Sequence, residues 1–431
     1  MHIFFSGIGG TGIGPLAVIA KQAGYEVSGS DVKPSSYIDY LAQQGVTDVH
    51  IGQTAEQIAK AHQAKPIDWF VYSSALPKTN PNHPELAFCQ ANGIRATRRD
   101  DLINEILSQK RLKLIAVAGT HGKTTVTAMA IWLFKRLDLP VSYSVGAKIS
   151  FGEMGQYKAD SKYFIYEADE YDRNFLSFYP DVALITGIDW DHPDIYPTRE
   201  SYYDAFTEFI GQSQKTVMWH DDAEMLGLDA DEGKIIIDDK DPQIEQALKL
   251  PGRVNRLDAW LVAKALQPIL DKPFEELINK LSDFPGVSRR FEMLAPNIYT
   301  DYAHTPPKIR GALQLAQEVA GDNVVVIYEG LHNTRQHFIK DELGGLFDGV
   351  KRLYIVPSYL AREDESLELL TPEKLLKLLN TPSRAKAAAA ELNDDLKRVI
   401  EHHAASGDLV MSFSAGGAGS LDEWLRQQFG R

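Results

Sequence analysis

The chain has 431 residues. A single hydrophobic core does not extend efficiently over a chain of this length, so we expect two or three domains. Hydrophobic residues make up 44% and charged residues 24% of the sequence, as in ordinary soluble globular proteins, and the net charge of -14 argues against nucleic acid or an acidic membrane surface as the main partner. Cys89 is the single cysteine, which excludes intrachain disulfides; we expect it to be a small buried hydrophobe in a cytoplasmic protein without a leader or a membrane span.

The first segment of the chain alternates strand and helix patterns. The strand IFFSG leads into a helix over residues 11–23, and YEVSGSD follows as a second strand. DWFVYSSA has the pattern of a buried strand, and residues 85–92 that of a short helix. Such alternation predicts a parallel, doubly wound sheet.

Two further segments repeat this alternation. One opens with the strand RLKLIAVAG and the helix TTVTAMAIWLFKRL, continues with KYFIYEAD, DVALITGI, KTVMWH and GKIIIDD, and ends in a helix after the Pro-Gly of LPGRVN. The other holds NIYTDYA, a helix over residues 307–319, NVVVIYEG, RLYIVPS and DLVMSFSAGG; the alanines at 387–390 are expected in a helix. We predict an α/β protein with domains at 1–110, 111–291 and 292–431, each a doubly wound, mostly parallel sheet.

A glycine-rich turn lies directly after the first strand. Gly7, Gly9 and Gly12 form G-x-G-x-x-G at the mouth of a helix, where glycine lets the backbone approach a pyrophosphate on the helix N-terminus. Asp31 ends the second strand, where a carboxylate accepts from a ribose hydroxyl. Taken alone, the motif leaves open a nucleotide site, a nicotinamide dehydrogenase and a tight turn without a ligand.

A second phosphate-binding pattern opens the central segment. Residues 119–125 read GTHGKTT between a strand and a helix. The turn aims N–H groups at phosphates, Lys123 reaches the β- and γ-phosphate oxygens, and the Thr124 hydroxyl is a ligand for Mg²⁺. The generic pattern has a glycine where this chain has Val117, so the motif is the shorter G-T-x-G-K-T-T form. We expect ATP to bind here.

Acidic residues follow the next buried strand. The stretch YEADEYD supplies four carboxylates, Glu167, Asp169, Glu170 and Asp172, whose hard oxygen atoms suit Mg²⁺. His192 follows a neighbouring strand, next to Asp191 in DWDHPD. The residue pattern leaves open whether His192 is a metal ligand or a structural histidine.

The order of motifs resembles the Mur ligase family over nearly the whole chain. These motifs are GIGGTGIGPLA, VSGSD, SSAL, GTHGKTT, EADEY, DWDHPD, LPGRVN, GVSRRFE and DYAHTP. The resemblance implies a Rossmann-like UDP-binding domain, a central P-loop ATPase domain and a C-terminal Rossmann-like domain that binds the amino acid. It also implies an ATP-dependent ligase of peptidoglycan synthesis that joins the lactyl carboxylate of UDP-N-acetylmuramate to L-alanine through an acyl phosphate.

The resemblance further implies roles at matching positions. ATP would be bound by Gly119, Thr120, His121, Gly122, Lys123, Thr124, Thr125, Asn255 at the adenine, Arg290 at the phosphates and Asp301 at the ribose. The UDP-sugar would be bound by Gly7, Gly9, Gly10, Gly12, Asp31 and Ser74. The catalytic set would be Lys123, Glu167, His192 and Arg290. Thr124 would hold one Mg²⁺, and Glu167 with His192 a second. His304 and Arg335 would face the incoming amino acid, although the loop EGLHNTRQ fits the family only with a one-residue shift.

Several positions depart from the family pattern and bear on the substrate. Gly187 replaces an asparagine before the DH motif, and Asp258 replaces the second asparagine of an N-x-x-N pair. DYAHTP is closer to the form in the diaminopimelate- or lysine-adding ligase. The lysine that later amino-acid-adding members carry after the DH motif is absent from TRESYYDAFTEFIGQ, which favours alanine addition or a peptide-recycling ligase that takes a tripeptide.

Two alternatives from other classes remain. A NAD-dependent dehydrogenase would use the first glycine motif and leave GTHGKTT without a ligand. A non-catalytic ATP-binding regulator would explain Gly187 and Asp258, but it would not need Lys123, Glu167 and His192. The oligomeric state stays open.

Overall fold

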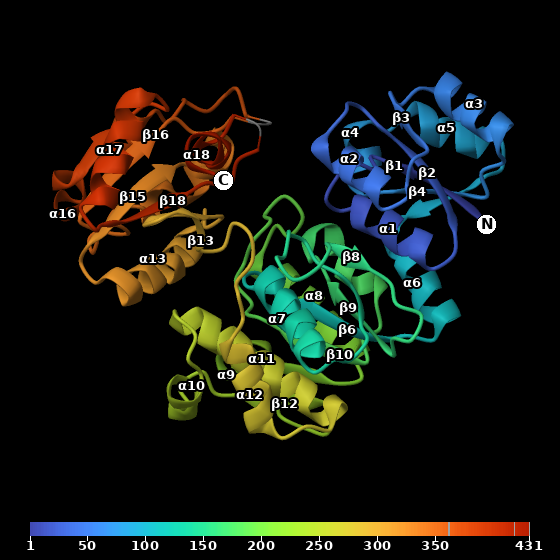
Figure 1. The fold of residues 1–431 in the computed structure, drawn as a ribbon, viewed down its shortest axis with the longest axis horizontal. Helices are drawn as coiled ribbons and strands as arrows, with labels where there is room; N and C mark the ends of the chain where they lie inside the picture. Colours follow the sequence, from blue (N-terminus) through green and yellow to red (C-terminus); the bar gives the residue numbers. More distant parts are fainter. Residues whose placement is uncertain (361–362, 418, 431) are drawn as a thin grey trace. The chain divides into compact units, whose positions relative to one another are not determined.

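A computed structural model describes residues 1–360, 363–417 and 419–430 (Figure 1). Contacts divide the chain into two compact units, Met1–Ile244 with Asp258–Phe284, and Glu245–Leu257 with Pro285–Arg431. The chain forms three α/β domains, each with one mostly parallel sheet, which confirms the predicted fold class. Among the helices of the described residues, none combines the length and the apolarity needed to cross a membrane.

The first sheet has the strand order β3-β2-β1-β4-β5, and all its pairs are parallel. Its strands are β1 His2–Ser6, β2 Glu26–Asp31, β3 Val49–Ile51, β4 Trp69–Tyr72 and β5 Arg95–Arg98. Its helices are α1 Gly14–Gln22, α2 Ser36–Gln43, α3 Ala55–Ala64, α4 Ala75–Thr79 and α5 Pro84–Ala91, and α6 Arg99–Lys110 leads into the next sheet. Every residue of β1 is buried, as the continuous apolar run of a central parallel strand requires.

The second sheet has the order β12-β11-β10-β6-β9-β7-β8, with β8 antiparallel to its neighbour. Its strands are β6 Lys113–Ala118, β7 Ser142–Ser144, β8 Gly155–Gln156, β9 Tyr163–Glu167, β10 Val182–Ile185, β11 Thr216–Trp219 and β12 Lys234–Ile237. The helices are α7 Lys123–Arg136, the 3₁₀ segment η1 Tyr171–Ser177, α8 Arg199–Gln212, α9 His220–Leu226, α10 Pro242–Ala247, α11 Arg253–Leu270 and α12 Phe274–Ser282. One hydrophobic cluster joins this sheet to the first, from Ile3 and Leu102 to Leu114 and Phe206, which is why the two domains form one compact unit.

The third sheet has the order β13-β14-β18-β15-β16-β17, and only its edge strand β13 pairs antiparallel. Its strands are β13 Glu292–Ala295, β14 Ile298–Asp301, β15 Val324–Glu329, β16 Arg352–Val356, β17 Ala387–Ala389 and β18 Leu409–Phe413. The helices are α13 Pro306–Ala320, α14 Asn333–Ile339, the 3₁₀ turn η2 Lys340–Glu342, α15 Pro372–Leu378, α16 Thr381–Ala385, α17 Asp394–Ala405 and α18 Leu421–Phe429. Separate apolar clusters cover the two faces of this sheet, as expected of a doubly wound domain.

The alanine run at 387–390 corrects one sequence prediction. These residues were expected in a helix, but Ala387–Ala389 form the edge strand β17, which pairs in parallel with Leu353, Tyr354 and Ile355 of β16. The preceding helix α16 stops at Ala385. Alanine has a high helix propensity, but the unpaired edge of β16 offers backbone partners, and that tertiary contact overrides the weak local preference.

Candidate functional site

The turn after β1 holds the first glycine motif in a tightly bonded loop. Gly7 has a φ of +73°, which a glycine adopts without strain, and the N–H groups of Gly7 and Ile8 both donate to the carbonyl of Ser30. Gly10 donates to the carbonyl of Gly7, and α1 then begins at Gly14. The loop therefore lies at the carboxyl edge of the sheet, before a helix N-terminus, as a diphosphate site requires.

Asp31, predicted to meet a ribose, pins this loop in the structure. One carboxylate oxygen accepts from the Gly9 N–H at 2.8 Å and the other from the Val32 N–H at 2.7 Å. A carboxylate has about four lone-pair positions, so these bonds leave acceptor capacity for a ligand hydroxyl. Ser74, also predicted for the UDP-sugar, is buried directly after β4, one strand from this loop.

A buried carboxyl lies beneath the loop, and the sequence analysis did not single it out. Glu85, in the first turn of α5, is fully buried and accepts from the Ser6 hydroxyl at 2.6 Å. The amide of Gln53 donates to the same Ser6 hydroxyl at 2.9 Å. Burial raises the pKa of Glu85 to about 7, although the hydroxyls of Ser30 and Ser6 oppose the shift. The loop thus rests on an acid that is partly protonated at neutral pH.

Replacing Glu85 by Gln is expected to remove a pH dependence of stability. Because the folded-state pKa is raised above its ordinary 4.5 to about 7, the folded protein keeps a proton that the unfolded chain releases between these values, so stability falls as pH rises through that window. Above it, ionised Glu85 costs about 3 kcal/mol. We expect thermal unfolding midpoints of the Gln variant to match the wild type at pH 5 and to exceed it at pH 8. Parallel pH curves for the two proteins would contradict this reading.

The second glycine motif follows β6 and opens α7. Gly119 and Gly122 have φ values of +141° and +80°, so both positions need glycine. The Thr120 N–H donates to the carbonyl of Gly187 at 2.8 Å, and the Thr120 hydroxyl donates to the carbonyl of Asp189 at 2.7 Å. These bonds tie the loop to the segment after β10. His121 lies 3.6 Å from the Asp189 carboxylate, and this contact lowers the pKa of Asp189.

Lys123 is the first residue of α7 and has two short contacts. Its ammonium donates to the carbonyl of Gly119 at 2.6 Å and pairs with the Glu170 carboxylate at 2.6 Å. Burial disfavours the charge, but the carboxylates of Glu170, Asp169 and Glu167 outweigh burial and raise the pKa of Lys123. In return, Lys123 and His192 overcome the burial of Glu170 and lower its pKa. The pair is therefore ionised, with the cation beside the phosphate loop.

Thr124 and Glu167, which the family resemblance assigns to two different Mg²⁺ ions, contact each other in the structure. The Thr124 hydroxyl donates to Glu167 at 2.8 Å, and the other oxygen of Glu167 accepts from the Gly146 N–H at 2.8 Å. Burial raises the pKa of Glu167, although these two hydrogen bonds lower it. A hydroxyl and a carboxylate converging at the first turn of a phosphate-loop helix are the oxygen donors that Mg²⁺ prefers, so these residues fit the ion.

His192, which the resemblance pairs with Glu167, lies next to Glu170 in the structure. Its Nε2 atom is 3.6 Å from Glu170 and 3.9 Å from Asp191, and its ring packs edge-on against Tyr171 with centroids 5.0 Å apart. Its φ of +57° is unusual for a residue other than glycine. The structure thus adds Glu170, which is 1% exposed in its side chain, as the group that joins Lys123 to His192.

Asn255 and Asp258, both on α11, belong to different compact units. The Asn255 amide donates to the carbonyl of Pro251 at 2.9 Å. Asp258 is buried, and it lies next to the second glycine motif: a Cβ added at Gly122 would be 3.2 Å from its carboxylate. Burial alone raises the pKa of Asp258 to about 8, so this acid is largely protonated at neutral pH and can donate a hydrogen bond, as the amide of asparagine does.

The second compact unit gathers four predicted residues around β14. Asp301 is buried, and its oxygens accept from the N–H groups of Phe291 and Ala303 at 2.8 and 2.7 Å. The guanidinium of Arg290 lies over the Tyr302 ring at 4.8 Å. Burial lowers the pKa of His304 to about 3, helped by the positive charges of Lys308, Arg290 and Arg335. Since these cations act on His304, Arg290, His304 and Arg335 lie in one positively charged neighbourhood, and Lys308 is a member that the sequence analysis missed.

A buried acidic network in the same unit was also missed. Glu329, at the end of β15, accepts from the Ser414 hydroxyl and from the Leu421 N–H, and burial raises its pKa. Arg289 donates to the carbonyl of Ser414 at 3.2 Å and lies 3.3 Å from Asp422. These groups fix the loop after β18 at the carboxyl edge of the sheet; only the glycines in SAGG hint at such a loop in the sequence.

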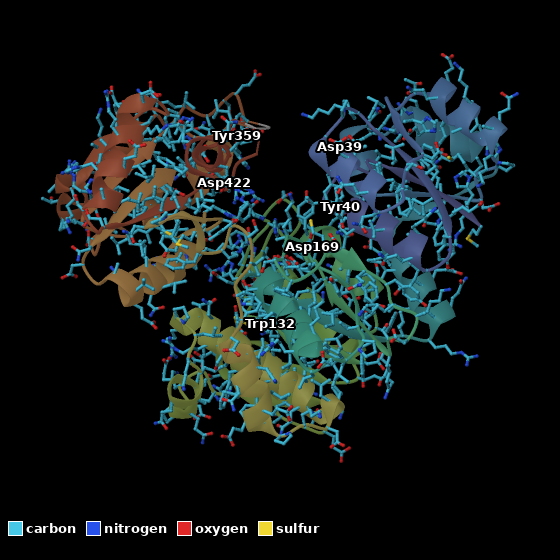
Figure 2. All side chains as sticks on the ribbon, viewed as in Figure 1. Asp39, Tyr40, Trp132, Asp169, Tyr359 and Asp422 are labelled. Carbon is cyan, nitrogen blue, oxygen red and sulfur yellow. The ribbon has the colours of Figure 1, made fainter. Side chains whose placement is uncertain are left out.

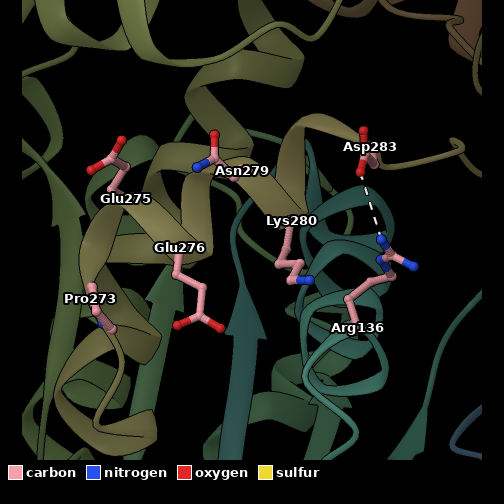
Figure 3. A pocket seen from close by; sticks show the side chains of 7 residues that line it. All are labelled: Arg136, Pro273, Glu275, Glu276, Asn279, Lys280 and Asp283. Carbon is pink, nitrogen blue, oxygen red and sulfur yellow. Dashed lines mark ion pairs between the residues drawn. The ribbon is translucent and has the colours of Figure 1, made fainter.

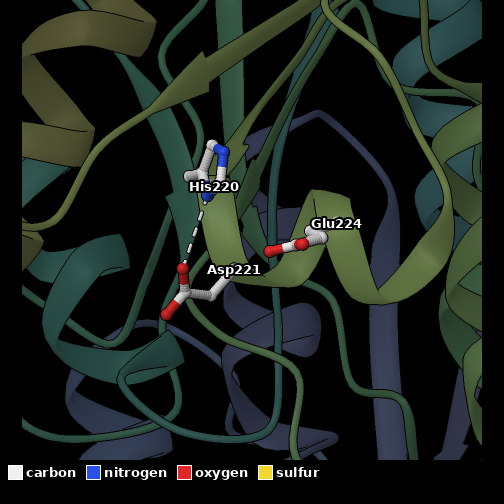
Figure 4. Close-up of side chains that lie close together, drawn as sticks. All are labelled: His220, Asp221 and Glu224. Carbon is white, nitrogen blue, oxygen red and sulfur yellow. Dashed lines mark hydrogen bonds and ion pairs between the residues drawn. The ribbon is translucent and has the colours of Figure 1, made fainter.

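Two polar features lie elsewhere on the surface. A groove of about 480 Å³ lies between α12 and the end of α7, where Arg136 pairs with Asp283 at 3.8 Å (Figure 3). On α9, the ligand atoms of His220, Asp221 and Glu224 lie within 4.8 Å of one another, but all three residues are exposed (Figure 4). Exposed charged groups of this kind are ordinarily hydrated, so we assign no ligand to either feature.

Three family models match consecutive parts of the chain. Residues 2–111 match the model of the Mur ligase family catalytic domain, residues 117–238 the Mur ligase middle domain, and residues 289–416 the Mur ligase glutamate ligase domain. The UDP-N-acetylmuramate–L-alanine ligase of Renibacterium salmoninarum is 32% identical over 98% of this chain and 95% of its own length, and that of Methylorubrum extorquens is 28% identical over 98% and 95%.

Two solved structures share the fold. The UDP-N-acetylmuramate-alanine ligase from Thermotoga maritima superposes with a TM-score of 0.76 at 24% identity, covering 99% of this chain and 98% of the other. A murein peptide ligase from Psychrobacter arcticus gives 0.62 at 23% identity, with the same coverage. The family models span all three domains in order, which confirms the resemblance predicted from the sequence motifs. The chain therefore belongs to the Mur ligase family and is an enzyme of the ligase class.

Proposed function

We propose that this enzyme uses ATP to join UDP-N-acetylmuramate to L-alanine in the cytoplasm. One observation carries the proposal: the ionised Lys123–Glu170 pair and the Thr124–Glu167 contact lie together at a phosphate loop, in a chain similar along its whole length to UDP-N-acetylmuramate–L-alanine ligases. The first glycine loop supplies a separate site for the nucleotide sugar. The dehydrogenase alternative leaves this second cluster without a role.

The reaction needs two displacement steps. In the first step, a lactyl carboxylate oxygen attacks the γ-phosphorus and the bond from that phosphorus to the β,γ-bridging oxygen breaks. The products of this step are ADP and an acyl phosphate. The amine of alanine then attacks the acyl carbon, and phosphate leaves from a tetrahedral intermediate as the amine loses a proton. Both steps bring anions together, so positioning and charge neutralisation supply the catalysis, and no protein nucleophile is required.

The residues of the central domain match these needs. Lys123 is held charged beside the loop and would turn from Gly119 and Glu170 to the β- and γ-phosphate oxygens. Thr124 would hold one Mg²⁺ ion, and Glu167 with His192 a second one. Bound there, Mg²⁺ supplies neutralisation of phosphate charge. Asp258, protonated, would donate to the nucleotide where the family has an amide.

The third domain would bind the amino acid. The Nδ1 atom of His304 lies 2.7 Å from the carbonyl of Tyr302, so Nδ1 carries the proton and Nε2 presents a lone pair. With a pKa of about 3 this ring is neutral, which suits it to accept from the ammonium of the amino acid. The guanidinium of Arg335 would hold the carboxylate through paired N–H donors.

Phosphate release on separate addition of L-alanine, glycine, L-serine, L-lysine and a tripeptide, each with ATP and UDP-N-acetylmuramate, tests the proposal. We expect alanine to be preferred, with glycine and serine poorer by about 10- to 200-fold, because one methylene is worth ~1–3 kcal/mol. Preference for the tripeptide or lysine would overturn the choice of amino acid but keep the ligase chemistry. No phosphate release with any of them would favour the non-catalytic ATP-binding regulator.

A further inference from the structure

Arg99 is the first residue of α6, and its side chain lies against the first glycine loop. Its Nη1 atom donates to the carbonyl of Gly12 at 3.4 Å. A Cβ added at Gly12 would lie 2.5 Å from the same Nη1 atom, so the absence of a side chain at Gly12 is what lets the guanidinium reach the loop. The arginine side chain is 17% exposed, which leaves one part of it open to solvent.

The same guanidinium faces the acidic loop of the central domain. Its Nη2 atom lies 4.0 Å from Asp169, which is labelled in Figure 2, and its Nε atom lies 3.6 Å from Asp100. Asp169 directly precedes Glu170, the partner of Lys123. Within one compact unit, Arg99 therefore lies between the first glycine loop and the acidic loop whose Glu170 pairs with Lys123 of the second glycine motif.

Each of these contacts is long for a charged group. Hydrogen bonds from a guanidinium to a carboxylate are ordinarily about 2.7–2.9 Å, whereas the shortest polar contact of Arg99 within the described residues is 3.4 Å, to a neutral carbonyl. One oxygen of Asp100 is buried without a hydrogen-bond partner among the described residues. The pKa of Arg99 is raised by Tyr166, Asp100 and Asp169, although burial lowers it. Arg99 is therefore positively charged, while its N–H donors make only long hydrogen bonds and ion pairs among the described residues.

We propose that Arg99 binds the diphosphate of the nucleotide sugar and is a substrate-binding residue of the first domain. The N–H groups of the glycine loop and the N-terminus of α1 supply partial charges, but in a chain with a net charge of -14 the dianionic ligand needs a local cation. A guanidinium at Gly12 can place two N–H donors on neighbouring phosphate oxygens. Asp100 and Asp169 hold it in position when no ligand is bound. The inference rests on the proposed function, because it assumes a UDP-sugar at this loop.

Calorimetric titration of the Arg99→Met variant tests this role, since methionine keeps an apolar stem and removes the charge and the donors. The probes are UDP-N-acetylmuramate and UDP alone. We expect both dissociation constants to rise about 10- to 100-fold, as the loss of a charged hydrogen-bonded contact implies, while that for ATP changes less than about twofold. Arg98→Ala is the matched control, because Arg98 is half exposed and pairs only distantly with Asp172, at 3.9 Å. That variant should bind both probes as the wild type does.

The Arg99→Lys variant separates charge from geometry. Lysine keeps the charge but lacks the paired donors, so its dissociation constants should fall between those of the wild type and the methionine variant. A merely structural Arg99 would lower the unfolding temperature of the methionine variant and leave its UDP affinity unchanged, which would overturn the inference. An equal loss of UDP affinity in the Arg98 variant would also overturn the inference. The diphosphate would then be attracted by the overall positive charge of this region and not by a direct contact with Arg99. If the wild type itself fails to bind UDP-N-acetylmuramate, the proposed function is wrong.

Discussion

Replacing Lys123 by Ala is expected to lower the rate of phosphate release at saturating ATP at least about a thousandfold, since several kcal/mol of transition-state stabilisation would be lost. The ammonium is held charged by three carboxylates at the mouth of α7, where the γ-phosphate of ATP would lie. Single-turnover phosphate release in the presence of UDP-N-acetylmuramate and L-alanine measures the effect. A lysine with no more than a structural role would leave this rate almost unchanged.

The structure also shows why this variant alone is ambiguous. Without Lys123, the buried carboxylate of Glu170 loses its cationic partner at 2.6 Å, and an uncompensated buried charge costs about 3–5 kcal/mol of stability. The double variant Lys123→Ala with Glu170→Gln removes that charge. We expect it to recover the unfolding temperature lost by the single variant and to remain inactive. A folded double variant that keeps more than a tenth of the wild-type rate would refute the role of Lys123.

The sequence predicted the fold class and the family because both depend on local patterns. The glycines at positions 7, 119 and 122 indicate loops in the sequence. In the structure each of them has a positive φ, which few other residues adopt. Continuous apolar runs such as β1 and β6 identify central parallel strands. For the alanines of β17 the local pattern predicted the wrong structure, because this edge strand is stabilised by pairing with its neighbour and not by its own residues.

The sequence could not predict which polar side chains contact one another across long stretches of chain. Glu85 meets Ser6 across 79 positions, and Glu167 meets Thr124 across 43, so no spacing rule connects them. Glu170 was visible as one of four carboxylates in YEADEYD, but only the turn of the chain after β9 selects it as the partner of Lys123. Arg99 lies in a run of charged residues, RRDD, that has the pattern of an exposed helix start, and tertiary contacts alone distinguish it from Arg98.

Gly119→Ala is expected to weaken ATP binding more than about a hundredfold, because a displacement of about 1 Å in a binding loop can have an effect of this size. An added Cβ would collide with the hydroxyl of Thr186 and lie 3.0 Å from the Thr186 nitrogen and the Gly187 carbonyl. Real Cβ atoms essentially never come within 3.0 Å of another heavy atom, so the Thr186 side chain or the loop must move, and the two backbone atoms at 3.0 Å leave the loop little room. Movement would break the bond from Thr120 to Gly187 and displace the carbonyl that holds Lys123. Calorimetric titration with ATP measures the loss.

Gly187→Ala is the matched control, since Gly187 has nearly the same backbone conformation, with a φ of +142° against +141°, and no atom lies within 4 Å of an added Cβ. Both variants carry a similar conformational strain of about 1–3 kcal/mol, so the difference between them isolates the collision with Thr186. We expect Gly187→Ala to lower the unfolding temperature and to change the dissociation constant for ATP by less than about tenfold, within the same strain. Equal losses of ATP affinity in the two variants would show that strain, and not the packing of the loop against Thr186, governs nucleotide binding. Wild-type affinity in Gly119→Ala would mean that ATP does not bind at this loop.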